Sequence, residues 1–453
     1  MQHSHEALDR PGGFERARLL APLRHRDFRV LWAGMAVSLV GDGIFLIAIA
    51  WETYVLWNAP AALSIVGIGM TVPTVLFLLL GGVLSDRHDR RLLMLWSDLV
   101  RAAAVATLAA LAFAGALRLW ELVALVAVYG CGTAFFIPAF EAVVPDLLPA
   151  EDLAAANSLD QFVRPIALRL LGPLLGGWLV AAGAGLAFTV DAASFGASAL
   201  AVLAMRPRAR SGVVAVSHGA ALREGLSFIR RRVWLWGTLV VAAAAYLVFL
   251  GPSEVLLPYM VKNELHASAR DLGLVFAAGG VGAVGAALWM GQRGHPRRDI
   301  TAMYATWTVA TLALAGYGLA AASWQLMLAC LVFNALETAG TIVWVTVKQR
   351  HVPGEMLGRV SSLDWLISIG LLPISFALTA PVAGALGVRA TLVGAGLVGA
   401  AITLGGLFLP GMRDIESGGP RRRSRLHLHA TRGYSSAGRA PGSHPGGRRF
   451  ESG

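Results

Sequence analysis

Residues 149–160 read PAEDLAAANSLD and residues 353–364 read PGEMLGRVSSLD, so the same residue stands at six of twelve positions at a constant offset of 204 residues. Coincidence is the alternative explanation, because a few residue types dominate the chain. Six matches at a single offset nevertheless favour an internal repeat, and such self-similarity indicates a chain built from similar structural units. We therefore predict two halves of like architecture, with these stretches at corresponding positions.

The composition places both halves in a membrane. Of the 453 residues, 56% are hydrophobic and 14% are charged, whereas a soluble domain carries roughly 25% charged residues. This composition excludes a disordered chain and a nucleic-acid-binding domain, and it argues against a soluble enzyme. The net charge of +11 could indicate nucleic acid or anionic lipid as a partner. The arginines, however, lie in loops and at the two ends, which is typical of membrane topology. We expect the lipid bilayer, and no nucleic acid, as a partner.

Twelve stretches are long and apolar enough to span a bilayer, which requires about 20 residues each. They are 29–52, 62–84, 92–116, 120–140, 161–182, 185–205, 233–252, 271–291, 300–320, 325–346, 361–382 and 388–410. An even number of spans places both ends of the chain on one side. Together with the repeat, this predicts an all-α integral membrane protein with twelve transmembrane helices in two six-helix, pseudo-symmetric halves, a plan used by transporters.

The basic residues predict which side the ends occupy. If the N-terminus is cytoplasmic, the inner segments before the C-terminal tail carry 22 arginine and lysine residues, and the outer loops carry only Arg118, Lys262, Arg270 and Arg389. Cytoplasmic loops are enriched in lysine and arginine. We therefore expect a multi-pass protein of the plasma membrane with both termini in the cytoplasm.

The same reasoning divides the chain into five parts. These are a cytoplasmic N-terminal segment (1–28), a first six-helix bundle (29–205), a cytoplasmic linker (206–232), a second six-helix bundle (233–410) and a disordered basic cytoplasmic tail (411–453). The tail is polar and rich in arginine and glycine, so it cannot bury a core. It is either a solvated basic tail near anionic lipid or the product of read-through into a neighbouring RNA gene.

The loop after the second predicted span contains a recognisable signature. It reads GVLSDRHDRR over residues 82–91, with Gly82, Asp86, Arg87, Arg90 and Arg91 at the signature positions. This pattern resembles the loop between helices 2 and 3 of the major facilitator superfamily. The resemblance implies that Gly82 allows close helix packing and that Asp86 and the arginines form a gating loop. The alternative is a positively charged loop that only sets topology.

The fifth predicted span contains LGPLLGG over residues 171–177. The residues Gly172, Pro173, Gly176 and Gly177 resemble a motif of proton-coupled drug exporters in the same superfamily. Pro173 should kink the helix, and Gly172 and Gly176 should allow another helix to approach closely. The alternative is a packing kink without influence on transport direction.

Residues 132–160 and the Gly41-Asp42-Gly43 triplet are similar to the exporter branch that contains enterobactin, macrolide and multidrug efflux proteins. The resemblance implies a monomeric secondary transporter that exports a small amphipathic organic compound, such as a drug, macrolide or siderophore, by alternating access driven by protons. It implies no cofactor. The alternatives are a lipid or metabolite transporter of the same fold, a channel, or a multi-pass membrane enzyme. For an enzyme we find neither a phosphate-binding loop nor a metal-ligand or nucleophile constellation, so we predict no catalytic residue and no metal site.

Ionisable residues at membrane depth are candidates for function, because charge in hydrocarbon is costly. At a rise of 1.5 Å per residue, Asp42 lies roughly 20 Å and Arg169 roughly 13 Å from the inner face. We predict Asp42 as the proton carrier, Arg169 as its switchable partner, Glu337 as a further proton-coupling residue and Asn334 as part of the substrate cavity. A permanent buried pair of Asp42 and Arg169 that only fixes helix packing is the alternative.

Three further acidic residues have structural interpretations. We expect Asp191 to bond to a neighbouring helix. Asp160 with Arg164, and Asp98 with Arg101, have the spacing of ion pairs on one helix face at the inner interface.

Overall fold

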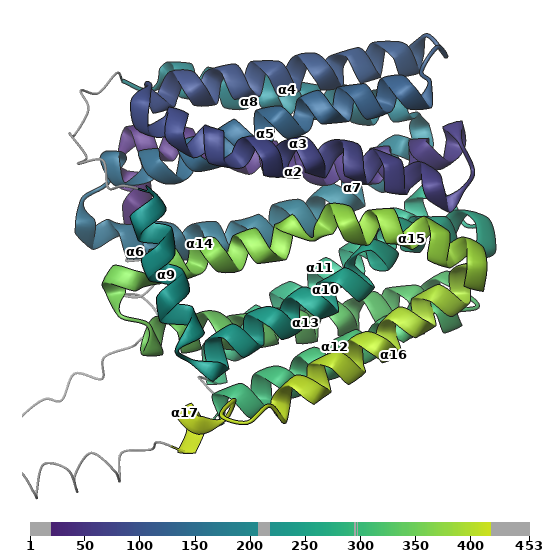
Figure 1. Ribbon diagram of the computed structural model, residues 1–453. Helices are drawn as coiled ribbons and strands as arrows, with labels where there is room; N and C mark the ends of the chain where they lie inside the picture. Colours follow the sequence, from purple (N-terminus) through teal and green to yellow (C-terminus); the bar gives the residue numbers. More distant parts are fainter. Residues whose placement is uncertain (1–19, 207–217, 294–295, 297, 418–453) are drawn as a thin grey trace, which may run out of the picture.

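A computed structural model describes residues 20–206, 218–293, 296 and 298–417, and every element in this part of the chain is helical. Figure 1 shows long helices running side by side, back and forth along one axis. Eleven of the described helices are long and apolar enough to cross a membrane. The helix α12 (Asp299–Leu319) is also long enough, with 21 residues, but it is less apolar because it carries four threonines. It packs between α13 (Ser323–His351) and α16 (Val388–Leu407).

The N-terminal half contains six membrane helices after the short 3-10 helix η1 (Ala21–Arg24). They are α2 (Arg26–Leu56), α3 (Pro60–Arg87), α4 (Arg90–Phe113), α5 (Leu119–Leu147), a composite helix of α6 (Ala150–Pro165), η2 (Ile166–Leu171) and α7 (Gly172–Ala182), and α8 (Ala184–Ala204). Within this half α3 packs on α5, α2 on α8, and α4 on both α5 and α8.

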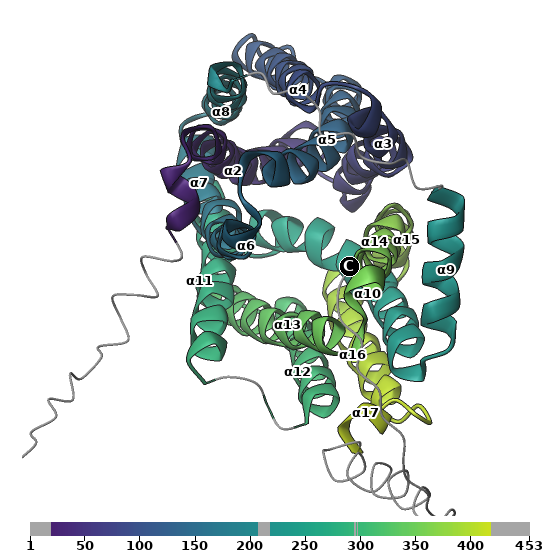
Figure 2. The ribbon, with the colours of Figure 1, turned by 90° about the vertical axis from the view of Figure 1, so that its left-hand side faces the viewer.

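The C-terminal half repeats this plan after α9 (His218–Arg230). Its helices are α10 (Val233–Tyr259) with η3 (Met260–Glu264), α11 (Ala269–Arg293), α12, α13 (Ser323–His351), a composite helix of α14 (Gly354–Gly370) and α15 (Leu372–Leu386), and α16 (Val388–Leu407). The predicted twelve-helix, two-half fold is therefore confirmed. In Figure 2, which looks along the helix axes, the two halves lie next to each other and α9 lies at the side of the molecule.

The internal repeat is a property of the helices themselves. The helix α13 begins and ends 204 residues after α5, and α14 and α16 begin 204 residues after α6 and α8. This is the offset that the sequence repeat predicts. The helices extend beyond the predicted spans, as α2 does with 31 residues, because a helix continues past the hydrocarbon core, which about 20 residues cross.

The start of the predicted C-terminal tail packs against the bundle. Met412 is fully buried beside Thr238, and α17 (Asp414–Ser417) follows it. The Glu416 carboxylate accepts hydrogen bonds from the backbone N–H and the hydroxyl of Thr301 at 2.6 and 2.8 Å. The bundle thus extends to residue 417, beyond the predicted boundary at 410, and residues 418–453 lie outside the described part.

Candidate functional site

The composite fifth helix changes its winding at the middle of the N-terminal half. Pro173 has no N–H group, so it cannot donate to the carbonyl of Arg169 four residues earlier. The π-helical segment η2 lies just before this point, and the N–H of Gly172 donates to the carbonyl of Ala167, five residues back. A π turn of this kind often marks a functional position. Here it contains Arg169.

Arg169 reaches across to the C-terminal half. Its Nη1 donates a hydrogen bond to Oδ1 of Asn334 at 3.3 Å and lies 4.0 Å from Oε2 of Glu337, both on α13. A Cβ on Gly280 of α11 would lie 2.4 Å from the carbonyl oxygen of Arg169, so α11 approaches η2 closely. The Arg169 side chain is nevertheless 51% exposed. A charged and accessible side chain in the middle of a membrane helix indicates an aqueous space between the halves.

Close packing joins the halves at the end of the bundle away from residue 20, which we call the far end. The Tyr54 hydroxyl donates to the carbonyl of Val255 at 2.6 Å, and the Lys262 ammonium group donates to the carbonyl of Tyr54. Gly177 and Gly273 face each other, because a Cβ on Gly177 would lie 2.9 Å from the Cα of Gly273.

At the opposite end, which we call the termini end, the polar contacts between described residues stay within one half. His25 contacts Asp152 at 2.9 Å, and Arg90 donates to Asp146 at 2.5 Å. Exposed apolar side chains lie on both halves here, among them Phe162 and Trp365. Figure 2 shows α6 and α14, which carry these two residues, on either side of the centre. This conformation is therefore closed at the far end and open at the termini end.

Asp42 does not contact Arg169 in this conformation. Its Oδ1 accepts a hydrogen bond from the Tyr129 hydroxyl of α5 at 2.6 Å. The Tyr129 ring in turn stacks on Phe45 with centroids 4.6 Å apart. Asp42 thus belongs to the interior of the N-terminal half, whereas Arg169, Asn334 and Glu337 meet between the halves.

The ion pair of Asp98 and Arg101 forms as predicted, with 2.5 Å between the atoms, but in a different place. The two side chains are 0% and 4% exposed, so the pair is buried inside the N-terminal half and does not lie at the inner membrane interface. The Arg101 guanidinium lies 4.4 Å from the ring centroid of Phe136 and 4.3 Å from that of Phe195. The second predicted pair, Asp160 with Arg164, forms at 3.2 Å and is partly exposed.

The fully buried Asp191 differs from its prediction. It accepts a hydrogen bond from Ser194 of its own helix at 3.3 Å, not from a neighbouring helix. Its Oδ1 does lie against α2, because a Cβ on Gly41 would be only 2.5 Å from it. Asp191 therefore acts at a close helix contact without a bond between the helices.

The predicted gating loop holds the N-terminal half together at the termini end. Arg90 also donates to the carbonyl of Ala142 at 2.9 Å, and Arg91 donates to the carbonyls of Val202 and Leu203 at 2.8 and 2.6 Å. Arg87 is exposed at the end of α3. The side chain of Asp86 lies outside the described part of the structure.

The close helix contact predicted for Gly82 is made by the neighbouring glycine. A Cβ on Gly82 would meet no atom within 4 Å, whereas a Cβ on Gly81 would lie 2.3 Å from the carbonyl oxygen of Ala134. The close helix contact expected at Gly82 is therefore made by Gly81, where α3 meets α5.

The glycines of the fifth-helix motif pack in two directions. A Cβ on Gly172 would lie 2.5 Å from the Cα of Gly43, and one on Gly176 would lie 3.0 Å from the Cα of Ile44, both on α2. Gly177 faces the C-terminal half at Gly273. Pro173 is buried between these contacts. The motif thus brings α7 close to both halves at once.

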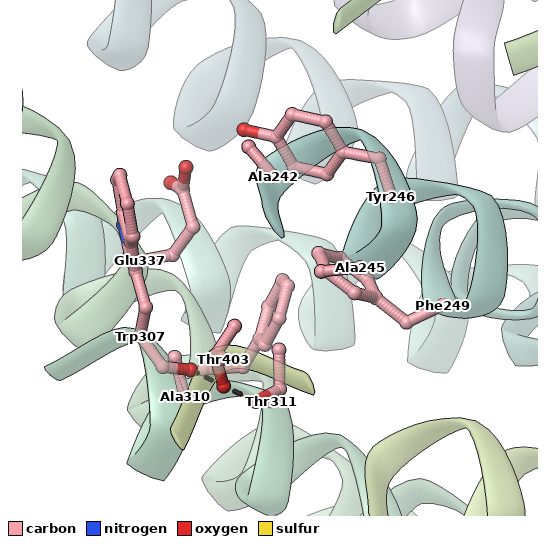
Figure 3. Close-up of a pocket in the computed structure, with 10 residues that line it drawn as sticks. Ala242, Ala245, Tyr246, Phe249, Trp307, Ala310, Thr311, Glu337 and Thr403 are labelled. Carbon is pink, nitrogen blue, oxygen red and sulfur yellow. Dashed lines mark hydrogen bonds between the residues drawn. The ribbon is translucent and has the colours of Figure 1, made fainter. Parts of the chain in front are cut away.

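The C-terminal half contains a cavity that the sequence analysis missed. It is narrow and open at its mouth, with about 30 Å³ of space for the centres of water molecules. Its walls are Ala242, Ala245, Tyr246, Phe249, Trp307, Ala310, Thr311, Phe333, Glu337 and Thr403. Figure 3 shows the Glu337 carboxylate beside the ring of Trp307. Aromatic residues in apolar helices are usually core residues, so their pattern did not indicate a cavity. The available signal was the repeat: at the offset of 204, Tyr246 corresponds to Asp42, which was predicted to be functional.

Twelve membrane helices in two repeated halves, closed at one end and sharing a charged contact at the centre, define a membrane transporter of the major facilitator type. Residues 17–426 match the family described as Transmembrane secretion effector, and the protein belongs to this family. No group of three or more metal-binding side chains is found among the described residues.

Named relatives agree with the exporter resemblance. The chain is 26% identical over 369 residues to macrolide efflux protein A of Streptococcus pyogenes, covering 80% of this chain and 90% of that protein. It is 29% identical over 357 residues to the enterobactin exporter EntS of Citrobacter koseri, covering 75% and 81%. A solved bacterial homologue of the iron transporter ferroportin, in its inward-facing state, has the same fold. Its TM-score is 0.62 at 17% identity, covering 84% of this chain and 99% of that one.

Proposed function

We propose that this protein is a proton-coupled exporter of a small amphipathic organic compound and works as a monomer in the plasma membrane. The observation that carries the proposal is the accessible Arg169, which pairs across the two halves with Asn334 and Glu337. The excess of basic residues at the termini end supports a cytoplasmic location of that end. The conformation described above is then open to the cytoplasm, the side from which an exporter loads.

The two halves rock around the central contact in this mechanism. Opening the far end separates Gly177 from Gly273 and releases Tyr54 from Val255, which are the contacts that close it now. The gating loop of Gly82, Asp86, Arg87, Arg90 and Arg91 closes the termini end in the other state. Its arginines already tie α4 to α5 and α8, so the N-terminal half moves as one body.

Protons enter the cycle through Asp42 and Glu337. A nearby guanidinium stabilises a charged carboxylate, and its departure favours protonation. Arg169 lies on η2, which packs against α2 next to Asp42. In the present state it contacts Glu337. Rocking that moves Arg169 from Glu337 towards Asp42 makes proton binding depend on which side is open, which couples proton entry to substrate exit.

Vesicles with an imposed pH gradient test the proposal, using labelled macrolide, enterobactin and a lysolipid. Asp42→Asn should abolish accumulation driven by the gradient while downhill exchange continues, because only the proton step is lost. Glu121→Gln, at the exposed start of α5, serves as the control and should leave both activities unchanged.

Three outcomes would contradict this assignment. Full driven transport by Asp42→Asn removes Asp42 from the proton path. Loss of folded protein in that variant makes Asp42 a packing residue. Transport of the lysolipid alone favours the lipid transporter of the same fold.

A further inference from the structure

We propose that the cavity in the C-terminal half, here called the C-half chamber, binds the substrate, and that this substrate is an amphipathic organic cation. Its ammonium group takes the place of Arg169 at the Glu337 carboxylate. The inference rests on the proposed export function, because it names the class of compound that the same central site accepts. It is carried by the origin of the chamber, by the chemistry of its walls and by the position of Arg169 at Glu337.

The chamber exists because the two halves differ at corresponding positions. At the offset of 204, Phe45 and Tyr129 correspond to Phe249 and Phe333, and both pairs of rings are in contact. The fully buried Phe195 of α8 corresponds to Gly399 of α16. A Cβ on Gly399 would lie 3.5 Å from Thr311 and 3.6 Å from Phe249, so a ring there would enter the chamber. The C-terminal half therefore lacks the ring that fills its counterpart.

The walls suit a cation with an apolar body. Four of the ten wall residues are aromatic, and Glu337 is the one charged residue among them. Aromatic faces attract organic ammonium groups, and the attraction grows when the site is dry. In Figure 3 the carboxylate of Glu337 and the hydroxyl of Tyr246 face the same empty space. A neutral compound would gain the apolar contacts but leave the carboxylate without a new partner.

A second, wider cavity continues the chamber and shares Ala242, Tyr246 and Trp307 with it. Its walls contain Lys348 and Asp364, which form an ion pair with each other, so this part of the path adds no net charge. By the same measure as for the chamber, this second cavity offers about 250 Å³, so it has room for the apolar body of a molecule whose charged group lies at Glu337.

Arg169 is the competitor for the same carboxylate. It lies 4.0 Å from Glu337, and Glu337 also accepts a hydrogen bond from Thr341 at 3.0 Å. A bound ammonium group would repel the guanidinium and end the central contact between the halves. Substrate binding would then release the N-terminal half to move, which links loading to rocking.

Equilibrium binding of radiolabelled benzyltrimethylammonium to the purified full-length protein tests this inference. Neopentylbenzene, which has the same shape without the charge, is the neutral comparison. Glu337→Gln should weaken binding of the cation at least tenfold and leave binding of the neutral compound unchanged. Arg169→Gln should tighten binding of the cation threefold or more, because the competitor is gone. Glu151→Gln, which removes an exposed carboxylate at the start of α6 outside the walls of both cavities, should change neither value by more than twofold.

Filling the chamber gives an independent test. Gly399→Phe restores the ring of the N-terminal half and should weaken cation binding at least tenfold. Gly405→Phe places the same ring on the same helix in open space and should have no effect. Unchanged affinity in Glu337→Gln, or weaker cation binding in Arg169→Gln, overturns the proposal. If Gly399→Phe does not fold, the opposite signs expected for Glu337→Gln and Arg169→Gln decide it alone.

Failure of this inference differs from failure of the export function. If the protein binds no cation but accumulates a neutral or anionic compound in the vesicle assay, the substrate class is wrong and export stands. If the cation binds with the expected signs but no compound is driven by the pH gradient, the chamber stands and proton-driven export is wrong.

Discussion

The interiors of the two halves are built on the same helices and filled in opposite ways. In the N-terminal half, the Arg101 guanidinium lies between the rings of Phe136 and Phe195 and is paired with Asp98. In the C-terminal half, Gly399 takes the place of Phe195, and the interior is an open chamber.

This difference indicates that the two halves of the repeated fold have different roles. A buried ion pair between aromatic rings allows few alternative arrangements, because each charge loses its partner when the other moves. The chamber of the C-terminal half has one carboxylate in its wall and a wider cavity beside it, an arrangement that leaves room for a ligand. We expect the N-terminal half to act as a rigid body and the C-terminal half to carry the binding surface.

The largest effect is expected from breaking the buried pair. Asp98→Asn removes the carboxylate that forms the direct ion pair with the buried Arg101, which should lower the free energy of unfolding by about 3–5 kcal/mol. Denaturant titration of the purified protein measures it. Asp160→Asn breaks an ion pair of the same half that is partly exposed, and such pairs contribute about 0–1 kcal/mol. Equal losses in the two variants would show that the interior pair does not stabilise the N-terminal half.

A smaller effect is expected from exchanging the ring residues at corresponding positions of α5 and α13. Tyr129→Phe removes the hydroxyl that donates to Asp42, which should cost about 1.5–3 kcal/mol if Asp42 is charged. Phe333→Tyr adds a hydroxyl to a ring that lines the chamber and should cost less than about 1 kcal/mol. Denaturant titration of both variants gives the comparison. A larger loss in Phe333→Tyr would mean that the chamber is as tightly packed as the N-terminal interior.

Much of the fold could be predicted from the sequence. The low charge, the twelve apolar stretches and the repeat after Pro149 and Pro353 are properties of the whole chain. They therefore survive errors at single residues. The fifth-helix motif also indicated its local structure, because a proline without an N–H and small glycines act through the backbone itself.

The central site was predictable only in part. Arg169, Asn334 and Glu337 were recognisable as polar residues at membrane depth, but their pairing depends on how the two halves dock. Asp98 and Arg101 were predicted at the inner membrane interface but are buried. The spacing of two residues along one helix does not show which other helices cover them. The chamber was missed because it arises from the absence of a ring at Gly399, and the sequence of one half does not reveal a missing side chain.

The smallest effect is expected where corresponding helices begin. In the N-terminal half, Asp89 caps α4 by accepting a hydrogen bond from the N–H of Arg91 at 2.9 Å. The corresponding helix α12 begins after Arg298, which makes no side-chain cap. Glu416, from beyond α16, instead binds the N–H of Thr301. The C-terminal half thus uses a distant segment for a task that the N-terminal half performs locally.

Two truncations and one substitution measure this last difference. Ending the chain after Ser417 should leave stability and transport unchanged, whereas ending it after Met412 should lower the free energy of unfolding by about 1 kcal/mol, because the cap of α12 is lost. Asp89→Ala should cost a similar amount in the N-terminal half for the same reason. Denaturant titration of the three proteins, with transport measured in parallel, makes the comparison. If the chain ending at Met412 is as stable as the full-length protein, Glu416 does not act as a cap and the bundle ends at Met412.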